Sequence, residues 1–502
     1  MGSRGAGVRD GTMNVKILSK LIGFLLLFLA VSQLFCLGFS IWQSESTEGI
    51  DAIEAFAISI GFALVSGLTL LALGRGAGNE LLRRESVSVV GLGWVFCTVF
   101  GSLPYFLCEP RMGLANSLFE SVSGFTATGA TVIADVESLP RSLLLWRALT
   151  QWLGGMGILV LFVALLSSFG AGSKALFRHE SSTFETEGLS PRIQWISLQL
   201  WGIYLGMSLL CFLGLRLLGM GNFDAVCHTF TTVATGGFST YNTSIGHFDS
   251  LAIELWIIVF MVLGAINFML YAWLVRAQWD RWRQDEASRV LLLVLACVTL
   301  MIGANLALGG EYGGWQRSFR DALFQVVAIM TTTGFSTADF DQWPAFSVML
   351  LVVLMVVGGC AGSTSGGLKV GRFILFFKII HFQLRTGFRP NQVLQLRLNG
   401  NSVSDRFRID TLFLIGVAGI SVLVGSVVVT LLQPQHDLRT CVSAVVATLF
   451  NIGPALGDVG PTNHYGDLYG ITKIFLSFLM VLGRLEFYAL LVLFVPSLWR
   501  RY

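Results

Sequence analysis

Four short runs of residues recur along the chain, and each ends in a glycine that follows small, hydroxyl-bearing or apolar residues. Aligned on those glycines, the runs are Thr126, Ala127, Thr128 and Gly129; Val233, Ala234, Thr235 and Gly236; Thr331, Thr332, Thr333 and Gly334; Phe450, Asn451, Ile452 and Gly453. Because glycine tolerates backbone conformations that a side chain would strain, such a run can turn its carbonyl oxygens to one side. Four runs facing one axis would form stacked carbonyl rings, which can replace the hydration shell of a monovalent cation.

A single string of this kind is typical of an ordinary loop turn, so its context decides between the two interpretations. A short amphipathic segment precedes each run, at 116–128, 222–234, 318–332 and 438–451, and membrane-length segments flank it on both sides. These short segments cannot cross a bilayer, which requires about 20 helical residues. Irregular backbone at membrane depth is tolerated only inside protein or against water, so we expect the four runs to face a central cavity.

The long apolar segments predict ten membrane spans. They lie at about 16–43, 52–74, 87–108, 143–169, 194–218, 249–276, 288–308, 345–380, 410–433 and 468–498. The expected fold is an all-α polytopic membrane protein. It has four pseudo-symmetric repeats of a first helix (M1), a pore loop and a closing helix (M2) around a central ion path, plus two extra N-terminal transmembrane helices. The predicted divisions are 1–86 for the N-terminal tail and extra helices, then 87–180, 181–285, 286–390 and 391–502 for the repeats.

Composition supports a membrane protein and excludes several other classes. Of 502 residues, 54% are hydrophobic and 13% charged, whereas soluble domains are typically about 25% charged. A net charge of +3 is too small to suggest nucleic acid as a partner, so membrane lipid is the expected surrounding. Eight scattered cysteines and six histidines show no metal-ligand spacing. The spacing of nucleophiles, bases and acids assembles no catalytic site, so we predict no enzyme and no organic cofactor.

Basic residues indicate the orientation. Most of the 33 Lys and Arg residues lie in segments 1–20, 75–84, 174–192, 276–289, 369–408 and 500–501. The positive-inside rule places these segments, and therefore both termini, in the cytoplasm. All four pore loops then enter the membrane from the outside.

A glycine-rich segment interrupts the third closing helix and is the candidate gate. Its residues are Gly358, Gly359, Cys360, Ala361, Gly362, Ser363, Thr364, Ser365, Gly366 and Gly367. Such a composition does not hold a regular helix in lipid, so a broken helix with a loop beneath the filter is expected. The alternative is a glycine-rich packing face. Glycines at 154, 264, 358 and 483 align the four closing helices, 24 to 30 residues after the run glycines.

Arg484 is the second candidate gate residue. It lies deep in the last apolar segment, where a buried arginine is costly and is usually paired. We expect it to donate hydrogen bonds to carbonyls of the glycine-rich segment and to hold the gate shut. The alternative is a local ion pair with Glu486 or Glu120.

These motifs carry a family resemblance. SGFTATGAT, TTVATGGFST, TTTGFST and NIGPALGDVGP, with WLGGMG, GGCAGSTSGGLK and LGRLEFY, closely resemble the TrkH/TrkG/KtrB superfamily of potassium-uptake proteins from about residue 87 to the end. The two extra N-terminal helices favour the TrkH type. The resemblance implies K⁺ as the transported ion, a homodimer, a bacterial inner-membrane location, and a cytosolic nucleotide-binding ring of the TrkA type that controls the gate.

The resemblance also assigns roles. It implies ion contacts by the backbone of Ala127–Gly129, Ala234–Gly236, Thr332–Gly334 and Asn451–Gly453, and a gate formed by the glycine-rich segment and Arg484. The fourth run departs most from the pattern, which predicts a wider side of the filter. In relatives that select sodium the first-run glycine becomes serine, so Gly129 argues for potassium.

The prediction is therefore a gated potassium uptake subunit. A potassium symporter coupled to H⁺ or Na⁺ is the alternative, and a receptor or scaffold without transport is a third. No carboxylate is plainly placed along the path, because Asp224, Asp339, Asp341 and Asp458 are expected near the mouth, where they would concentrate cations.

Overall fold

The computed structural model describes residues 13–45, 50–77, 83–157, 193–310, 312–388 and 395–496. These residues are almost entirely helical, as the sequence predicts. The described strands, β1 (Arg397–Leu398) and β2 (Asn401–Ser402), form one short antiparallel hairpin beside helix α17.

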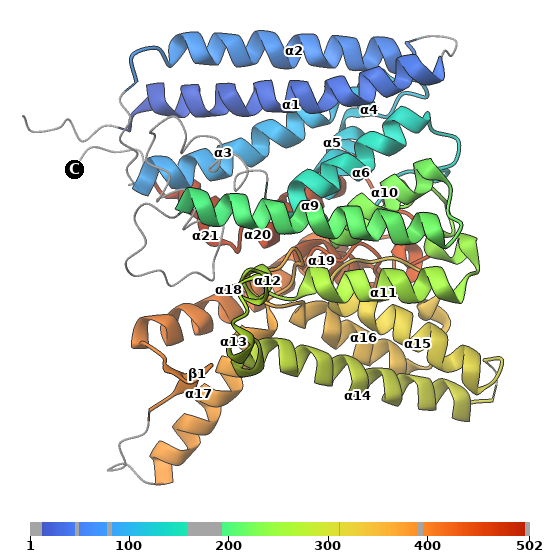
Figure 1. Ribbon diagram of the computed structural model, residues 1–502, viewed down its shortest axis with the longest axis vertical. Coiled ribbons are helices and arrows are strands. Elements are labelled where there is room, and N and C mark those ends of the chain that lie inside the picture. The colour runs from blue at the N-terminus through green and yellow to red at the C-terminus, as the bar shows by residue number, and fades with distance from the viewer. Residues whose placement is uncertain are drawn as a thin grey trace, which may run out of the picture.

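Two long helices form an outer layer at the N-terminal side. Helices α1 (Val15–Gln43) and α2 (Ala52–Leu73) run antiparallel and in contact along their length (Figure 1). They approach closely because Gly23 lies against the backbone of Gly67. The side chain of Gln33 donates to the carbonyl of Phe100 at 3.3 Å, which ties the pair to α3 (Arg83–Gly101).

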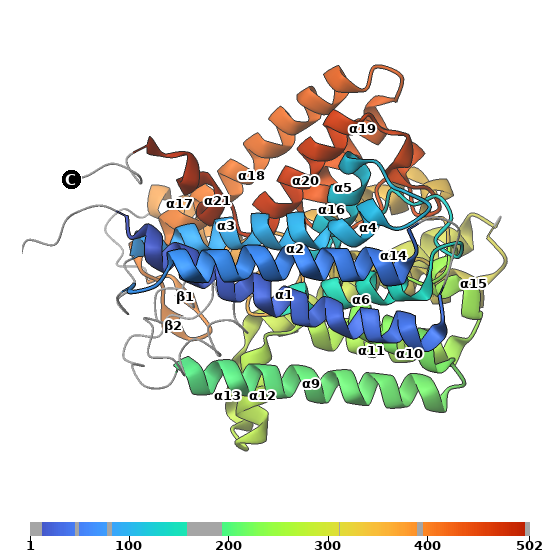
Figure 2. The same cartoon turned by 90° about the horizontal axis from the view of Figure 1, so that it is seen from above.

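The remaining helices repeat one arrangement four times. The first helices are α3 with the short α4 (Leu103–Leu107), then α9 (Ile193–Leu217), α14 (Glu286–Leu308) and α18 (Asp405–Leu432). The short pore helices are α5 (Leu114–Phe125), α10 (Asn222–Val233), α15 (Trp315–Met330) and α19 (Leu438–Leu449). The closing helices begin with α6 (Arg141–Gly155), α11 (Leu251–Ala265), α16 (Ala345–Val357) and α20 (Gly470–Arg484). Figure 2 shows the fourth repeat, α18 to α20, on the side of the molecule opposite α9.

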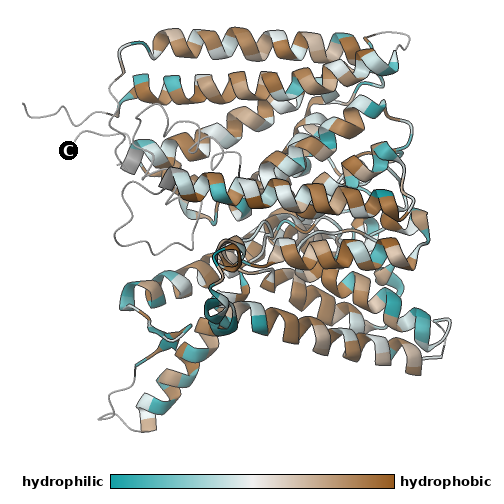
Figure 3. Cartoon of the chain, in the orientation of Figure 1, coloured by the Kyte–Doolittle hydropathy of each residue, from teal (hydrophilic) through white to brown (hydrophobic). Residues whose placement is uncertain are grey.

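Among the described residues, six helices are long and apolar enough to cross a membrane, and two bent pairs raise the number to eight. Hydrophobic residues dominate the long helices α1, α2, α11 and α14 (Figure 3). Of the other two expected spans, the segment at 143–169 is described only to residue 157, and the segment at 345–380 is split in two. The expected membrane fold is therefore present, with shorter closing helices than the sequence suggested.

The closing helices correct one expectation. The sequence predicted a single broken closing helix, but α11 bends by 93° into α12 (Phe268–Val275), and α20 bends by 116° toward α21 (Tyr488–Leu491). The glycine-rich segment separates α16 from α17 (Val370–Phe388), as predicted, and α6 ends at Gly155.

Each of the four helices ends within one residue of its aligned glycine, at Gly155, Ala265, Val357 and Arg484. Extended backbone at Ile266 and Asn267 makes the second break, and Asn267 caps the new helix by accepting from the N–H of Met269. Positive φ angles at Glu486 and Phe487 make the fourth. None of the residues at these two breaks is a glycine or proline, so composition gave no sign of either break.

Candidate ion pathway

The four runs share one backbone conformation directly after the pore helices. One residue in each adopts a left-handed conformation: Ala127, Thr235, Thr332 and Asn451, with φ between 52° and 56°. Two residues later each run has a glycine with positive φ: Gly129, Gly237, Gly334 and Gly453. The residue between them is bonded back to the pore helix in all four runs, from Thr128, Gly236, Thr333 and Ile452.

This equivalence corrects the alignment of the second run. The sequence aligned Gly236 with Gly129, but the glycine of matching conformation and position is Gly237. The conformational equivalent of Thr128 is Gly236, and Val233 is the last residue of its pore helix. Two consecutive glycines made the register ambiguous. The sequence matches Thr235 and Gly236 to Thr333 and Gly334 of the third run, whereas the structure matches Gly236 and Gly237 to that pair.

The runs close into a ring in chain order. A Cβ placed on Gly129 would lie within 2.7 Å of the carbonyl oxygen of Gly236 in the second run, and one on Gly237 would meet the carbonyl of Thr333 as closely. In the same way Gly334 lies against the carbonyl of Ile452, and Gly453 against that of Thr128 in the first run. Glycine is therefore required at these four positions by its φ angle and by the close approach of the next run.

A cavity of about 120 Å³ opens on one side of this ring. Its lining includes the four ring glycines Gly129, Gly237, Gly334 and Gly453, and the residues that follow each run, such as Thr131, Ser239 and Ser336. Each pore helix ends next to the ring, so four helix C-termini, which carry partial negative charge, surround the path. This arrangement attracts cations without a carboxylate.

Three of the four pore helices also hold the segment that leaves their own run, through a polar side chain at one shared position whose role was not predicted from the sequence. Nine residues before the ring glycines stand Glu120, His228 and Gln325. Glu120 accepts from the N–H of Val132 at 3.1 Å, and His228 Nε2 lies 2.9 Å from the hydroxyl of Ser239. With its amide oriented to satisfy both neighbours, the side-chain oxygen of Gln325 accepts from the N–H groups of Thr337 at 2.8 Å and Ala338 at 3.3 Å, in the segment after the third run. Alignment on Gly237 would have revealed this position, because it brings the three polar residues into register.

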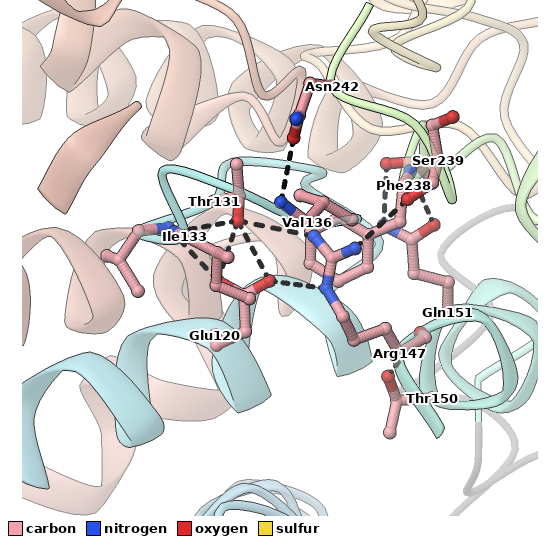
Figure 4. Close-up of polar contacts among 12 residues, drawn as sticks. Glu120, Thr131, Ile133, Val136, Arg147, Thr150, Gln151, Phe238, Ser239 and Asn242 are labelled. Atoms are coloured by element: carbon pink, nitrogen blue, oxygen red, sulfur yellow. Dashed lines mark hydrogen bonds and ion pairs between the residues drawn. The ribbon is translucent and has the colours of Figure 1, made fainter. Parts of the chain in front are cut away.

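Arg147 links the first two runs at the cavity wall (Figure 4). Its Nε donates to Glu120 Oε1 at 2.8 Å, and its Nη1 donates to the carbonyl of Ser239 at 3.1 Å. The guanidinium also stacks on the ring of Phe238, 4.1 Å from the centroid. Since Glu120 is fully buried and Arg147 only 2% exposed, each charge is balanced by the other.

The glycine-rich segment lies against the opposite side of the ring from the cavity. The N–H of Gly366 donates to the hydroxyl of Thr332 at 2.5 Å, and the N–H of Gly367 donates to the carbonyl of Phe450 at 3.0 Å. The hydroxyl of Thr364 donates to the carbonyl of Val233 at 3.1 Å. All three partners precede the ring glycines, whereas the cavity is lined by the ring and the residues after it.

The other residues of this segment are anchored to the broken second closing helix or to one another. The N–H of Cys360 donates to the carbonyl of Ala265 at 2.8 Å, and the carbonyl of Gly362 accepts from Phe268 at 2.9 Å. Positive φ angles at Gly358, Gly362 and Gly367 allow the tight turns. The remaining members fill the turns: Gly359, Ala361, Ser363 and Ser365.

Arg484 donates to three backbone carbonyls around this segment. Its Nη1 lies 2.9 Å from the carbonyl oxygen of Thr364, and its Nη2 lies 2.7 Å and 2.9 Å from those of Gly154 and Gly155. The expected contact with the glycine-rich segment is therefore present, and α6 supplies two acceptors that the sequence did not predict. Glu120 and Glu486, the alternative partners, form ion pairs with Arg147 and Arg372.

The four acidic residues expected near the mouth have other partners. Asp341 pairs with Arg439 at 2.6 Å, and Asp458 pairs with His436 at 2.6 Å. Asp224 accepts from Thr240 at 2.7 Å, and Asp339 accepts from the side chain of Gln342 at 2.7 Å. None of the four is among the described residues that line the cavity.

Comparison with known proteins assigns the family. The model of the TrkH family, described as a cation transport protein, matches residues 52–501. The chain belongs to the TrkH family. Membership places it among transport proteins of the membrane and not among enzymes.

Members of the TrkH family resemble the chain along nearly its whole length. The Trk system potassium uptake protein TrkH of Halomonas elongata is 38% identical over 97% of this chain and 100% of its own length. That of Escherichia coli K12 is 36% identical over 89% and 92%. The crystal structure of the potassium transporter TrkH from Vibrio parahaemolyticus matches with a TM-score of 0.85 and 33% identity, covering 97% of this chain and 100% of that one.

Proposed function

We propose that this protein takes up potassium across the bacterial inner membrane through the ring of four runs. The observation that carries the proposal is the closed ring, in which every glycine lies against the carbonyl of the next run. Backbone carbonyls held at fixed positions can replace the water around a potassium ion, and this needs no charged side chain. The related proteins named above as potassium uptake proteins support the choice of ion.

The residues proposed to contact the ion differ from the sequence expectation only in the second run. They are the backbone of Ala127–Gly129, Thr235–Gly237, Thr332–Gly334 and Asn451–Gly453. We propose that the repeats divide the chain at about 87–180, 181–285, 286–390 and 391–502, with the N-terminal tail and the two extra helices at 1–86. Both termini are proposed to lie in the cytoplasm, because the positive-inside rule favours that side for the basic segments.

The glycine-rich segment, locked by Arg484, is proposed as the gate. Its hydrogen bonds reach the second, third and fourth runs, so its displacement would free the path beneath the ring. A cytosolic nucleotide-binding ring of the TrkA type, acting on a homodimer of this chain, is the proposed source of that displacement. Both partners follow from family resemblance.

A channel-like path is favoured over a symporter. Coupling to H⁺ requires a titratable group on the path, and coupling to Na⁺ requires a second cation site. The described residues that line the cavity include no Asp or Glu, and Arg147, which is among them, is paired with Glu120. The other titratable side chains of the lining are engaged within the protein: His464 accepts from the N–H of Gly466, and Tyr241 and Tyr465 donate to Asp224 and to the carbonyl of Gly453. In a coupled carrier the reversal potential of the purified protein's current would move with pH or sodium, whereas a channel-like path predicts that it follows potassium alone.

The test is rubidium and sodium flux into proteoliposomes that hold this protein, beside the Gly129→Ser variant. We expect wild type to pass rubidium in preference to sodium. The variant should lose that preference, because the serine Cβ meets the carbonyl of Gly236 and distorts the ring. The same measurement with segment 358–367 shortened separates a closed gate from a protein that does not conduct. No flux with the shortened segment would contradict the proposal.

A further inference from the structure

The second run is the one whose middle position lacks a side chain. Its equivalents in the other runs are Thr128, Thr333 and Ile452, whereas the second run has Gly236. In the first and third runs that threonine hydroxyl pairs with the hydroxyl two residues earlier, at 2.7 Å in one and 2.8 Å in the other. The second run has no such pair, because Ala234 and Gly236 carry no hydroxyl.

Gln151 of α6 occupies the space that this missing side chain would take. A Cβ built on Gly236 would meet the amide of Gln151 itself, closer than real contacts allow. The Nε2 of Gln151 donates to the carbonyl of Gly236 at 2.7 Å, and its Oε1 accepts from the N–H of Phe238 at 3.1 Å. The side chain is fully buried, and its two hydrogen bonds hold the backbone on both sides of the ring glycine Gly237. Figure 4 shows Gln151 beside Phe238.

The other closing helices have no such group. Three residues before the aligned glycines 154, 264, 358 and 483 stand Gln151, Met261, Met355 and Met480, and the three methionines are fully buried. The polar residue thus occurs in the closing helix that packs against the run with the missing side chain. The carbonyl it holds is also the one that lies against Gly129, so the contact fixes the junction between the first two runs.

We propose that Gln151 is a positioning residue for ion selectivity, which holds the ring carbonyl of Gly236 in place of the side chain that the second run lacks. The inference rests on the proposed function of the ring as a potassium filter. Gly236 and Gln151 form a matched pair, and replacement of either one alone should disturb the position of the ring carbonyl. Gln151→Met alone frees the carbonyl, and Gly236→Thr alone collides with the glutamine.

The pair is tested by thermal melting of the full-length protein in detergent, as potassium or sodium replaces choline. This readout needs no open gate, because an ion bound to the folded state stabilises it by an amount that grows with the logarithm of the ion concentration divided by its dissociation constant. We expect the ratio of sodium to potassium dissociation constants to fall roughly tenfold in Gln151→Met, about the worth of one buried hydrogen bond. Gly236→Thr should lower it as well.

The double variant provides the decisive comparison. Gln151→Met with Gly236→Thr gives the second run the Thr-Gly sequence and the methionine of the third repeat, so its ratio should exceed that of either single variant. Met261→Leu, at the equivalent position of the second closing helix, is the matched control and should keep the wild-type ratio. An unchanged ratio in Gln151→Met, or a double variant no better than the worse single one, would overturn the inference alone. Equal stabilisation of wild type by both ions would overturn the proposed filter.

Discussion

At the scale of single residues, the ring depends on four glycines that are required for two separate reasons. Each has a positive φ angle, and each has the carbonyl of the next run where a Cβ would stand. A side chain at one of these positions would destabilise the fold by about 1–2 kcal/mol through the positive φ angle alone. It would also push the carbonyl of the next run out of place. Only this second effect has a direct consequence for a bound ion.

Comparison of two glycines separates these effects. Gly219 has a φ of 95° with open space around it, whereas Gly237 has a φ of 80° and lies against the carbonyl of Thr333. We expect Gly219→Ala to lower the free energy of unfolding by about 1–2 kcal/mol and to leave ion preference unchanged. Gly237→Ala should lose more stability and abolish the preference of the melting temperature for potassium. Equal effects of the two variants on ion preference would contradict the corrected register of the second run.

At the scale of elements, the broken closing helices bring their ends together beneath the ring. The end of α6 supplies the carbonyls of Gly154 and Gly155 to Arg484, at the end of α20. Glycines at 154 and 483 permit this approach, because each lies against the last carbonyls of its own pore helix, from Phe125 and Leu449. Arg484 therefore joins the first and fourth repeats to the glycine-rich segment of the third.

Replacement of Arg484 should loosen that junction. Arg484→Ala removes three charge-assisted hydrogen bonds, each worth about 1.5–3 kcal/mol, so we expect basal rubidium flux to rise at least about tenfold. The measurement is uptake into proteoliposomes without any cytosolic partner. Arg439→Ala, which removes a partly exposed ion pair with Asp341, serves as the control and should leave flux unchanged. If Arg484→Ala conducts no faster than wild type, the arginine has no part in the gate.

At the scale of the whole molecule, the two N-terminal helices form a packed layer outside the repeats. They contact each other and the first repeat, and none of their residues lines the described cavity at the ring. Their close packing depends on Gly23 and Gly67. We infer that this layer contributes to stability and not to the choice of ion.

Two glycines of α1 test this division. Gly23→Leu would force a side chain into the backbone of α2 and should lower stability by about 1–3 kcal/mol. Gly38→Leu places its Cβ where no other atom lies within 4 Å and should change stability little. Neither variant should alter the ratio of rubidium to sodium flux. A changed ratio in Gly23→Leu would mean that the outer layer shapes the filter.

The sequence by itself determined the class of fold and indicated the candidate site. Apolar periodicity over membrane-length segments does not depend on distant contacts, so the first helices and the half-helices of the repeats could be placed to within a few residues, whereas the closing helices were predicted too long. Repetition indicated the four runs, glycine and hydroxyl content indicated segment 358–367, and the depth of a charged residue in an apolar segment indicated Arg484. The contact of Arg484 with a carbonyl of that segment followed from the cost of burying an unpaired charge.

Only the tertiary structure decided the register of the second run, the bends after Ala265 and Arg484, and the roles of Arg147 and Gln151. The contacts of Arg147 with the carbonyl of Ser239 and of Gln151 with the carbonyl of Gly236 join groups 92 and 85 residues apart in the chain. Adjacent glycines carry no side chain that could mark their register, and a buried glutamine among apolar residues has no periodic signature. Contacts between repeats determine these features, and a single amino-acid sequence does not reveal which distant residues come into contact.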